Sequence, residues 1–163
     1  MPFYSPTLGN LNSRQVIKEI INYIAAEPKV LYEITVGCDS SSNATPNFLV
    51  VVTILRSGRG GRFFVKKINY SNKKFYHIRQ RIIQEVLISC QVALDLREKL
   101  QKEIKKQQIH SNYEFNYIHA DVGLNGPTKD MIKEVIGLIK GNGFEAKIKP
   151  ESYTASNIAD RYT

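Results

Sequence analysis

Hydrophobic positions recur with two different periods in the first half of the chain. From Ser13 to Ala26 they recur every three or four residues, as on one face of an amphipathic helix. From Val30 to Cys38 they alternate, and from Phe48 to Leu55 they are nearly continuous, so both segments are predicted to be strands. The glycine-rich stretch 57–61 predicts a hairpin turn into a third strand, Arg62 to Tyr70. These strands are expected to form an antiparallel meander.

Helices and strands are predicted to alternate in the second half. Helical periodicity from about Lys74 to Gln108 predicts the longest helix, and its highly charged part from Arg97 onward is expected to project into solvent. The elements expected after it are a strand over Tyr113 to Asp121, a helix capped by Thr128, a short strand over Phe144 to Lys149 and a final helix from Ser152.

This order of elements predicts an α/β fold, with the whole chain 1–163 forming a single domain that carries an N-terminal helix at about 13–26. A right-handed crossover makes the last two strands parallel. With the fourth strand beside the first, the result is a five-stranded mixed sheet of order 3-2-1-4-5 with helices on both faces. In open α/β sheets, sites form outside the carboxyl ends of strands where the strand order reverses.

Two predicted strands end in an aspartate at this point, Asp39 and Asp121. Glu85 shares a helical stripe with Ile82 and is expected to face the sheet, and Asp160 lies in the predicted final helix. Crowded carboxylates repel one another unless a cation neutralises them. Mg²⁺ and Mn²⁺ prefer oxygen ligands, and two such ions about 4 Å apart support phosphodiester hydrolysis by water. For each acid taken alone, a purely structural role is the alternative.

Composition and charge narrow the class of protein. Among the 163 residues no apolar run approaches the roughly 20 that span a bilayer, and the first residues do not resemble a signal peptide. Cys38 and Cys90 have no CxxC partners and fall in apolar segments, so a cytoplasmic protein with reduced thiols is expected.

The net charge of +8 is concentrated in the middle of the sequence. Between Asp39 and Glu85 there is no acidic residue, while nine basic residues are interleaved with aromatic ones. Such a segment can pair phosphates and stack bases, which predicts DNA, RNA or a hybrid as the partner. A solvated basic face is the alternative. The residues expected along the phosphates are Lys66, Lys67, Lys73, Lys74, Arg79 and Arg81.

Several short motifs carry a resemblance to a known family. They are 36–40 (VGCDS), 58–62 (GRGGR), 119–123 (HADVG) and 149–156 (KPESYTAS) with the following Ala159-Asp160. In these motifs the chain resembles the YkuK-type bacterial branch of the ribonuclease H-like superfamily. The resemblance implies a ribonuclease H-like fold in which four acids bind two metal ions. By position these acids correspond to Asp39, Glu85, Asp121 and Asp160.

The sequence therefore predicts a nuclease that uses two Mg²⁺ or Mn²⁺ ions, with Ser40 and His119 as supporting residues beside the carboxylates. No spacing of His and Cys suggests zinc. The main alternative is a non-catalytic nucleic-acid-binding or scaffold protein with the same fold, and a small-molecule phosphatase is a third. Metal ions between Asp39 and Asp121 would favour the enzyme, whereas a site filled by a lysine would favour the binding protein.

Overall fold

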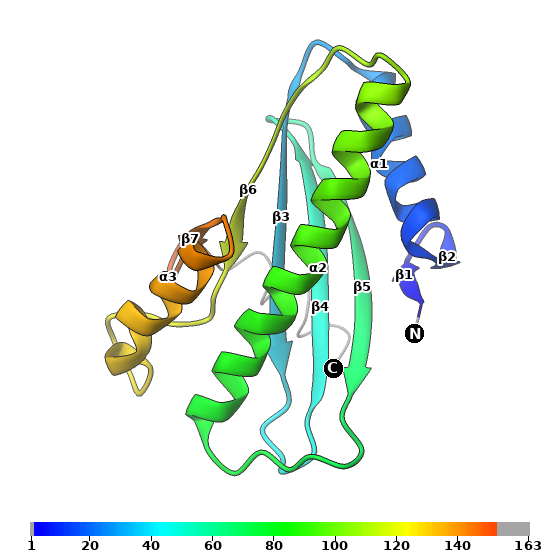
Figure 1. Cartoon of the computed structure of the whole chain (residues 1–163). Helices are drawn as coiled ribbons and strands as arrows, with labels where there is room; N and C mark the ends of the chain where they lie inside the picture. Colours follow the sequence, from blue (N-terminus) through cyan, green and yellow to red (C-terminus); the bar gives the residue numbers. More distant parts are fainter. Residues whose placement is uncertain (1, 153–163) are drawn as a thin grey trace.

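The computed structural model describes residues 2–152, which form one mixed β-sheet with helices packed against it (Figure 1). The strands are β1 (Phe3–Ser5), β2 (Gly9–Leu11), β3 (Leu31–Ser40), β4 (Asn47–Arg56), β5 (Gly61–Asn69), β6 (Asn112–His119) and β7 (Glu145–Lys147). The helices are α1 (Ser13–Ala26), α2 (Ile78–Lys106) and α3 (Ile132–Gly141), and a short 3-10 helix, η1 (Lys129–Met131), precedes α3.

The sheet has the order β2-β1-β5-β4-β3-β6-β7. Its last five strands confirm the predicted order 3-2-1-4-5, but the prediction of five strands was wrong, because β1 and β2 extend the sheet beyond β5. Each of these strands has only three residues, too few to show an alternating pattern in the sequence. The pair joins the sheet where Tyr4 lies opposite Val65.

The direction of the chain reverses at β3, as the sequence predicts. β3 pairs with β4 antiparallel and with β6 parallel, and β6 pairs with β7 parallel. The carboxyl ends of β3, β6 and β7 therefore lie at the same edge of the sheet. A register shift between Glu33 and Thr35 interrupts the β3–β6 pairing, and both Phe115 and Ile118 of β6 reach the main core.

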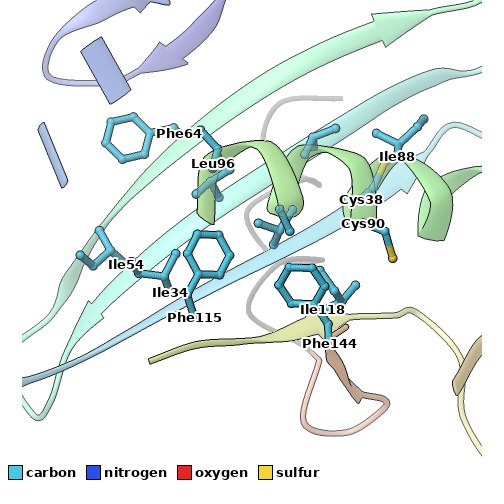
Figure 2. Close-up of a cluster of buried hydrophobic side chains, with 14 of the residues drawn as sticks. Ile34, Cys38, Ile54, Phe64, Ile88, Cys90, Leu96, Phe115, Ile118 and Phe144 are labelled. Atoms are coloured by element: carbon cyan, nitrogen blue, oxygen red, sulfur yellow. The ribbon is translucent and has the colours of Figure 1, made fainter. Parts of the chain in front are cut away.

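The main core lies between the helices and one face of the sheet. Figure 2 shows part of it, including Ile34 and Cys38 of β3, Leu96 of α2 and Ile118 of β6. Side chains from α1, α2 and α3 all belong to this cluster, and both α1 and α3 contact α2. Within residues 2–152 the helices thus share one face. The expectation of helices on both faces stays a prediction, because almost all of the predicted final helix from Ser152 lies outside the described residues.

α1 agrees with its prediction from the sequence, whereas the second half of α2 does not. α1 has the predicted bounds, and Asn12 and Gln15 form a capping box at its start. The second half of α2 does not project freely into solvent, because Leu96 and Leu100 are buried there. Its charged residues occupy the outer flanks, while the apolar stripe continues into the core.

Cys38 and Cys90 are buried free thiols. Burial raises the pKa of the Cys38 thiol, and the nearby carboxylates of Glu85 and Asp39 raise it further, so Cys38 is a poor nucleophile. Within residues 2–152, no helix combines the length and the hydrophobicity needed to cross a membrane.

Candidate active site

Two strand ends and one helix bring three carboxylates to the same edge of the sheet. Asp39 is the penultimate residue of β3, and Asp121 follows the end of β6 by two residues. Because β3 and β6 are parallel neighbours, the two aspartates lie at the same end of the molecule. Glu85 lies near the N-terminal end of α2 and is only 6% exposed.

Ser40 links two of these carboxylates. Its hydroxyl donates a hydrogen bond to Oε1 of Glu85 at 2.5 Å, and its backbone N–H donates to Oδ1 of Asp39 at 2.9 Å. The first bond joins the end of β3 to α2 across 45 residues of sequence. Ser40 thereby fixes the position of Glu85 relative to Asp39.

The charge of Glu85 is poorly compensated. Burial raises the pKa of this carboxyl to about 8, and the nearby Asp39 and Asp121 raise it as well, while the Ser40 hydrogen bond and Arg81 act in the opposite direction. A pKa near 8 means that Glu85 carries a proton at neutral pH. A bound cation would lower the pKa of Glu85 again, because positive charge stabilises the ionised carboxylate.

Lys149 supplies one positive charge to the site. Its Nζ lies 2.9 Å from Oδ1 of Asp121, in an ion pair that is partly exposed on both sides. The backbone N–H of Lys149 donates to the carbonyl of Val122 at 2.9 Å, which holds the segment after β7 against the loop after β6. A Cβ at Gly123 would lie 3.1 Å from Cβ of Lys149, so a glycine fits the close approach of these two segments.

His119 is buried beside the site but has no hydrogen-bond partner. Neither ring nitrogen is paired with any group in the part of the chain that the structure describes. Burial lowers the pKa of His119 to about 4, and Lys147 lowers it further, against a smaller opposite effect of Glu33. His119 is therefore an uncharged imidazole at neutral pH.

The predicted four-acid cluster is only partly described. Asp160 lies outside residues 2–152, and within that range no group of three or more His, Cys, Asp or Glu side chains is arranged to hold a metal ion. Asp39 and Asp121 both act on the charge of Glu85, but Glu85 is bonded to Ser40 and Asp121 to Lys149.

Two of the six basic residues predicted to contact phosphates are neighbours on β5. Lys66 lies opposite Val50, which faces the main core, and its Nζ lies 5.2 Å from the centre of the Phe3 ring. Lys67 lies opposite Leu49 and is exposed. Because successive strand residues point to opposite faces, this pair does not form one continuous basic surface.

The other four lie around the start of α2. Arg79 is paired with Glu134 of α3 at 2.7 Å and is therefore partly neutralised. Lys73 and Lys74 are exposed in the loop before α2. Arg81 lies close enough to Glu85 to lower the pKa of that carboxyl. The structure thus places Arg81 beside the carboxylates rather than only on a distant basic surface.

The sequence analysis did not identify Lys149 as a member of the site. In the sequence, Lys149 is the last residue of the predicted strand over Phe144 to Lys149 and the first residue of the motif 149–156. An ion pair between two loops leaves no periodic pattern in a sequence, so only the fold reveals the contact with Asp121.

Comparisons with known proteins identify the family of the chain. The model of the family described as Ribonuclease H-like matches residues 15–163. The chain is also similar to a protein of Bacillus subtilis (strain 168) described as "Uncharacterized protein YkuK", with 28% identity over 167 positions that cover 99% of this chain and 96% of the relative. No solved structure matches the chain. The match to the family model covers most of the chain and includes Asp39, Glu85 and Asp121, and the protein belongs to the Ribonuclease H-like family.

Proposed function

We propose that the protein is a nuclease that hydrolyses phosphodiester bonds of DNA or RNA with the help of divalent metal ions. The observation that carries this proposal is geometric: Ser40 is hydrogen-bonded to both Asp39 and Glu85, and the parallel pairing of β3 and β6 brings Asp121 to the same edge of the sheet. Acids from β3, α2 and the loop after β6 lie near one another at this edge of the sheet, close enough for Asp39 and Asp121 to raise the pKa of Glu85. A divalent cation would supply positive charge there.

The chemistry of these side chains suits Mg²⁺ or Mn²⁺. Asp39, Asp121 and Glu85 would hold the ions, together with Asp160, which lies outside the described residues. Carboxylate oxygens are the preferred ligands of both metals. When bound, two such ions activate a water molecule and stabilise the leaving oxygen of a phosphodiester. Ser40 orients Glu85 for this role through its hydroxyl.

Lys149 does not prevent metal binding under this proposal. The Lys149 side chain is 53% exposed and that of Asp121 is 31% exposed, so water screens their ion pair. Exposed pairs of this kind contribute about 0–1 kcal/mol, which a divalent ion can outcompete. The groups that lower the pKa of Glu85 are Ser40 and Arg81, and they leave it at about 8.

The contact between Lys149 and Asp121 also favours a second candidate. A lysine that permanently balances Asp121 would leave a protein that binds nucleic acid without cutting it. In that case the fold and the basic residues would serve binding alone, and divalent metal would have little effect on the protein.

Cleavage assays with matched variants test the proposal. The purified protein is incubated with Mn²⁺ and labelled single-stranded, duplex, hybrid and branched substrates. We expect at least one substrate to be cut, and Asp39→Asn to abolish cutting because it removes an anionic ligand at constant volume. Asp130→Asn makes the same change at an exposed position of η1 and should cut at the parent rate. Cleavage by Asp39→Asn at the parent rate would contradict the assigned site, and binding without any cleavage would support the second candidate.

A further inference from the structure

A basic groove separates α1 from the second half of α2. It has a volume of about 710 Å³, and the buried side chains of Ile17 and Ile21 contribute to its wall. Figure 1 shows α1 beside this half of α2. Five basic side chains line the groove, and Glu103 is the one acidic residue among the described residues that line it. The basic residues are Arg14, Lys18, Lys99, Lys102 and Lys106.

Most of this charge is not neutralised by neighbouring acids. Within residues 2–152, Lys99 is the one member of the five that forms an ion pair, with Asp95 at 2.9 Å. Glu103 accepts a hydrogen bond from the side chain of Gln107. The groove therefore presents a surplus of positive charge to whatever enters it.

Helix stability does not explain the cations of α1. Lysines near the end of a helix stabilise it, because the helix dipole places negative charge there, and this accounts for Lys106. Arg14 lies in the first turn of α1, where the dipole disfavours positive charge and where no acidic residue is present. A cation that weakens its own helix is better explained by a contact with an external anion.

The helix α2 connects the groove to the carboxylates. From Glu85 to Lys102 it rises about 25 Å. Four basic positions lie on the same side of Glu85 when α2 is viewed along its axis. Their rotation about the axis relative to Glu85 is about 40–100°, and they are positions 81, 99, 102 and 106. Arg79 lies on the other side and contacts α3. The three groove cations of α2 thus share one flank of this helix with Arg81, which lies beside the candidate active site.

From this geometry we infer that the α1–α2 groove binds the phosphate backbone of nucleic acid, about 25 Å from the point of cleavage. This inference rests on the proposed function and adds a second contact for the same substrate. Five cations on two helices are too widely spread for one small anion, but they suit a polymer with regularly repeated phosphates. A distance of 25 Å corresponds to about seven base pairs of duplex.

Binding measurements with the full chain in EDTA test the groove without cleavage. The groove variant is Lys18→Gln/Lys102→Gln/Lys106→Gln, and the control is Lys129→Gln/Lys133→Gln/Lys140→Gln on η1 and α3. Both remove three positive charges from exposed positions. We expect the groove variant to bind a labelled 20-base-pair duplex about tenfold or more weakly and to lower the slope of log K against log salt by two to three. The control should change the Kd less than threefold.

Equal weakening by the two variants, or unchanged binding by the groove variant, would overturn the inference. Lys102→Arg/Lys106→Arg keeps the charge and should bind like the parent, so a loss of binding in this variant would also count against it. A five-base-pair duplex cannot reach from the carboxylates to the groove, and the groove variant should not weaken its binding at the candidate active site. If the groove variant binds weakly while Asp39→Asn still cuts, the assignment of the active site is wrong, and the binding of nucleic acid by the groove is supported.

Discussion

Glu85 and Ser40 show how one residue contact sets the character of the site. The Ser40 hydroxyl lowers the pKa of Glu85, but burial and the nearby aspartates outweigh it and leave the pKa at about 8. Glu85 is therefore protonated at neutral pH, and its ionisation above pH 8 costs folding free energy.

This state of Glu85 predicts a stability that falls with rising pH. Its pKa is about 8 when folded and 4.5 without the fold, so the folded protein holds the extra proton between these values. The free energy of unfolding should therefore decrease as pH rises through this window, by about 2 kcal/mol between pH 6.5 and 8. Urea unfolding in EDTA should show this decrease in the wild type and not in Glu85→Gln. Parallel pH profiles for the two proteins would contradict the assignment.

His119 predicts a free energy of unfolding that rises with pH. Its pKa is about 4 when folded and 6.5 without the fold, so the unfolded chain binds the extra proton between these values. The contribution of His119 is fully present above pH 6.5 and is lost as pH falls toward 4, by about 3 kcal/mol in all. The wild type should therefore lose stability relative to His119→Phe over this range in urea unfolding. A constant difference between the two proteins would mean that His119 is not buried in its neutral form.

Lys149 gives a prediction about metal affinity. Removing its charge leaves Asp121 without its ion-pair partner, so Lys149→Met should bind Mn²⁺ several-fold more tightly than the wild type in calorimetric titrations. Lys140→Met, an exposed change on α3, serves as the control and should bind like the wild type. Weaker Mn²⁺ binding by Lys149→Met would show that this lysine assists the site rather than competing with metal.

At the scale of single residues, the sequence predicted where three acids lie in the fold but not which side chains contact them. Asp39 and Asp121 were predictable because each follows a strand pattern, and the burial of Glu85 followed from helical phase. The pairing of Asp121 with Lys149 depends on two loops that meet only in the folded chain. The pairing of Glu85 with Ser40 likewise depends on how α2 crosses the end of β3.

Among the elements, long periodic segments were predicted well and two of the short ones were missed. α1 and the four strands from β3 to β6 follow from hydrophobic periods. β1, β2 and β7 have three residues each, and of these three strands the sequence predicted β7 alone, within the longer segment Phe144 to Lys149. The second half of α2 was misjudged because its many charges obscured a continuing apolar stripe. Charge on the outer flanks of a helix does not prevent its inner face from packing.

Packing of this part of α2 can be measured directly. Leu100 is fully buried, whereas Leu94 on the same helix is 39% exposed. Leu100→Ala should therefore cost about 3 kcal/mol of unfolding free energy, and Leu94→Ala less than about 1 kcal/mol. Chemical denaturation of both variants provides the comparison. Similar small losses for the two would show that the second half of α2 does not pack against the core.

Across the whole molecule, the strand topology explains why the acids of the candidate site lie at the same edge, which no local stretch of sequence explains. The parallel pairing of β3 and β6 places Asp39 and Asp121 at the same edge although 82 positions separate them. The basic groove escaped sequence analysis for a related reason. Its cations come from α1 and α2, where acids such as Glu19 and Glu98 lie among them, so no run of like charge is visible.

The most direct test of the account is the binding of Mn²⁺ to the metal-free protein, measured by calorimetry for the wild type, Asp39→Asn and the control Asp130→Asn. The account predicts that the wild type and the control bind Mn²⁺ with the same affinity and that Asp39→Asn binds at least tenfold more weakly. Equal affinity in all three proteins, or no binding by the wild type at millimolar Mn²⁺, would contradict a metal site at this edge of the sheet.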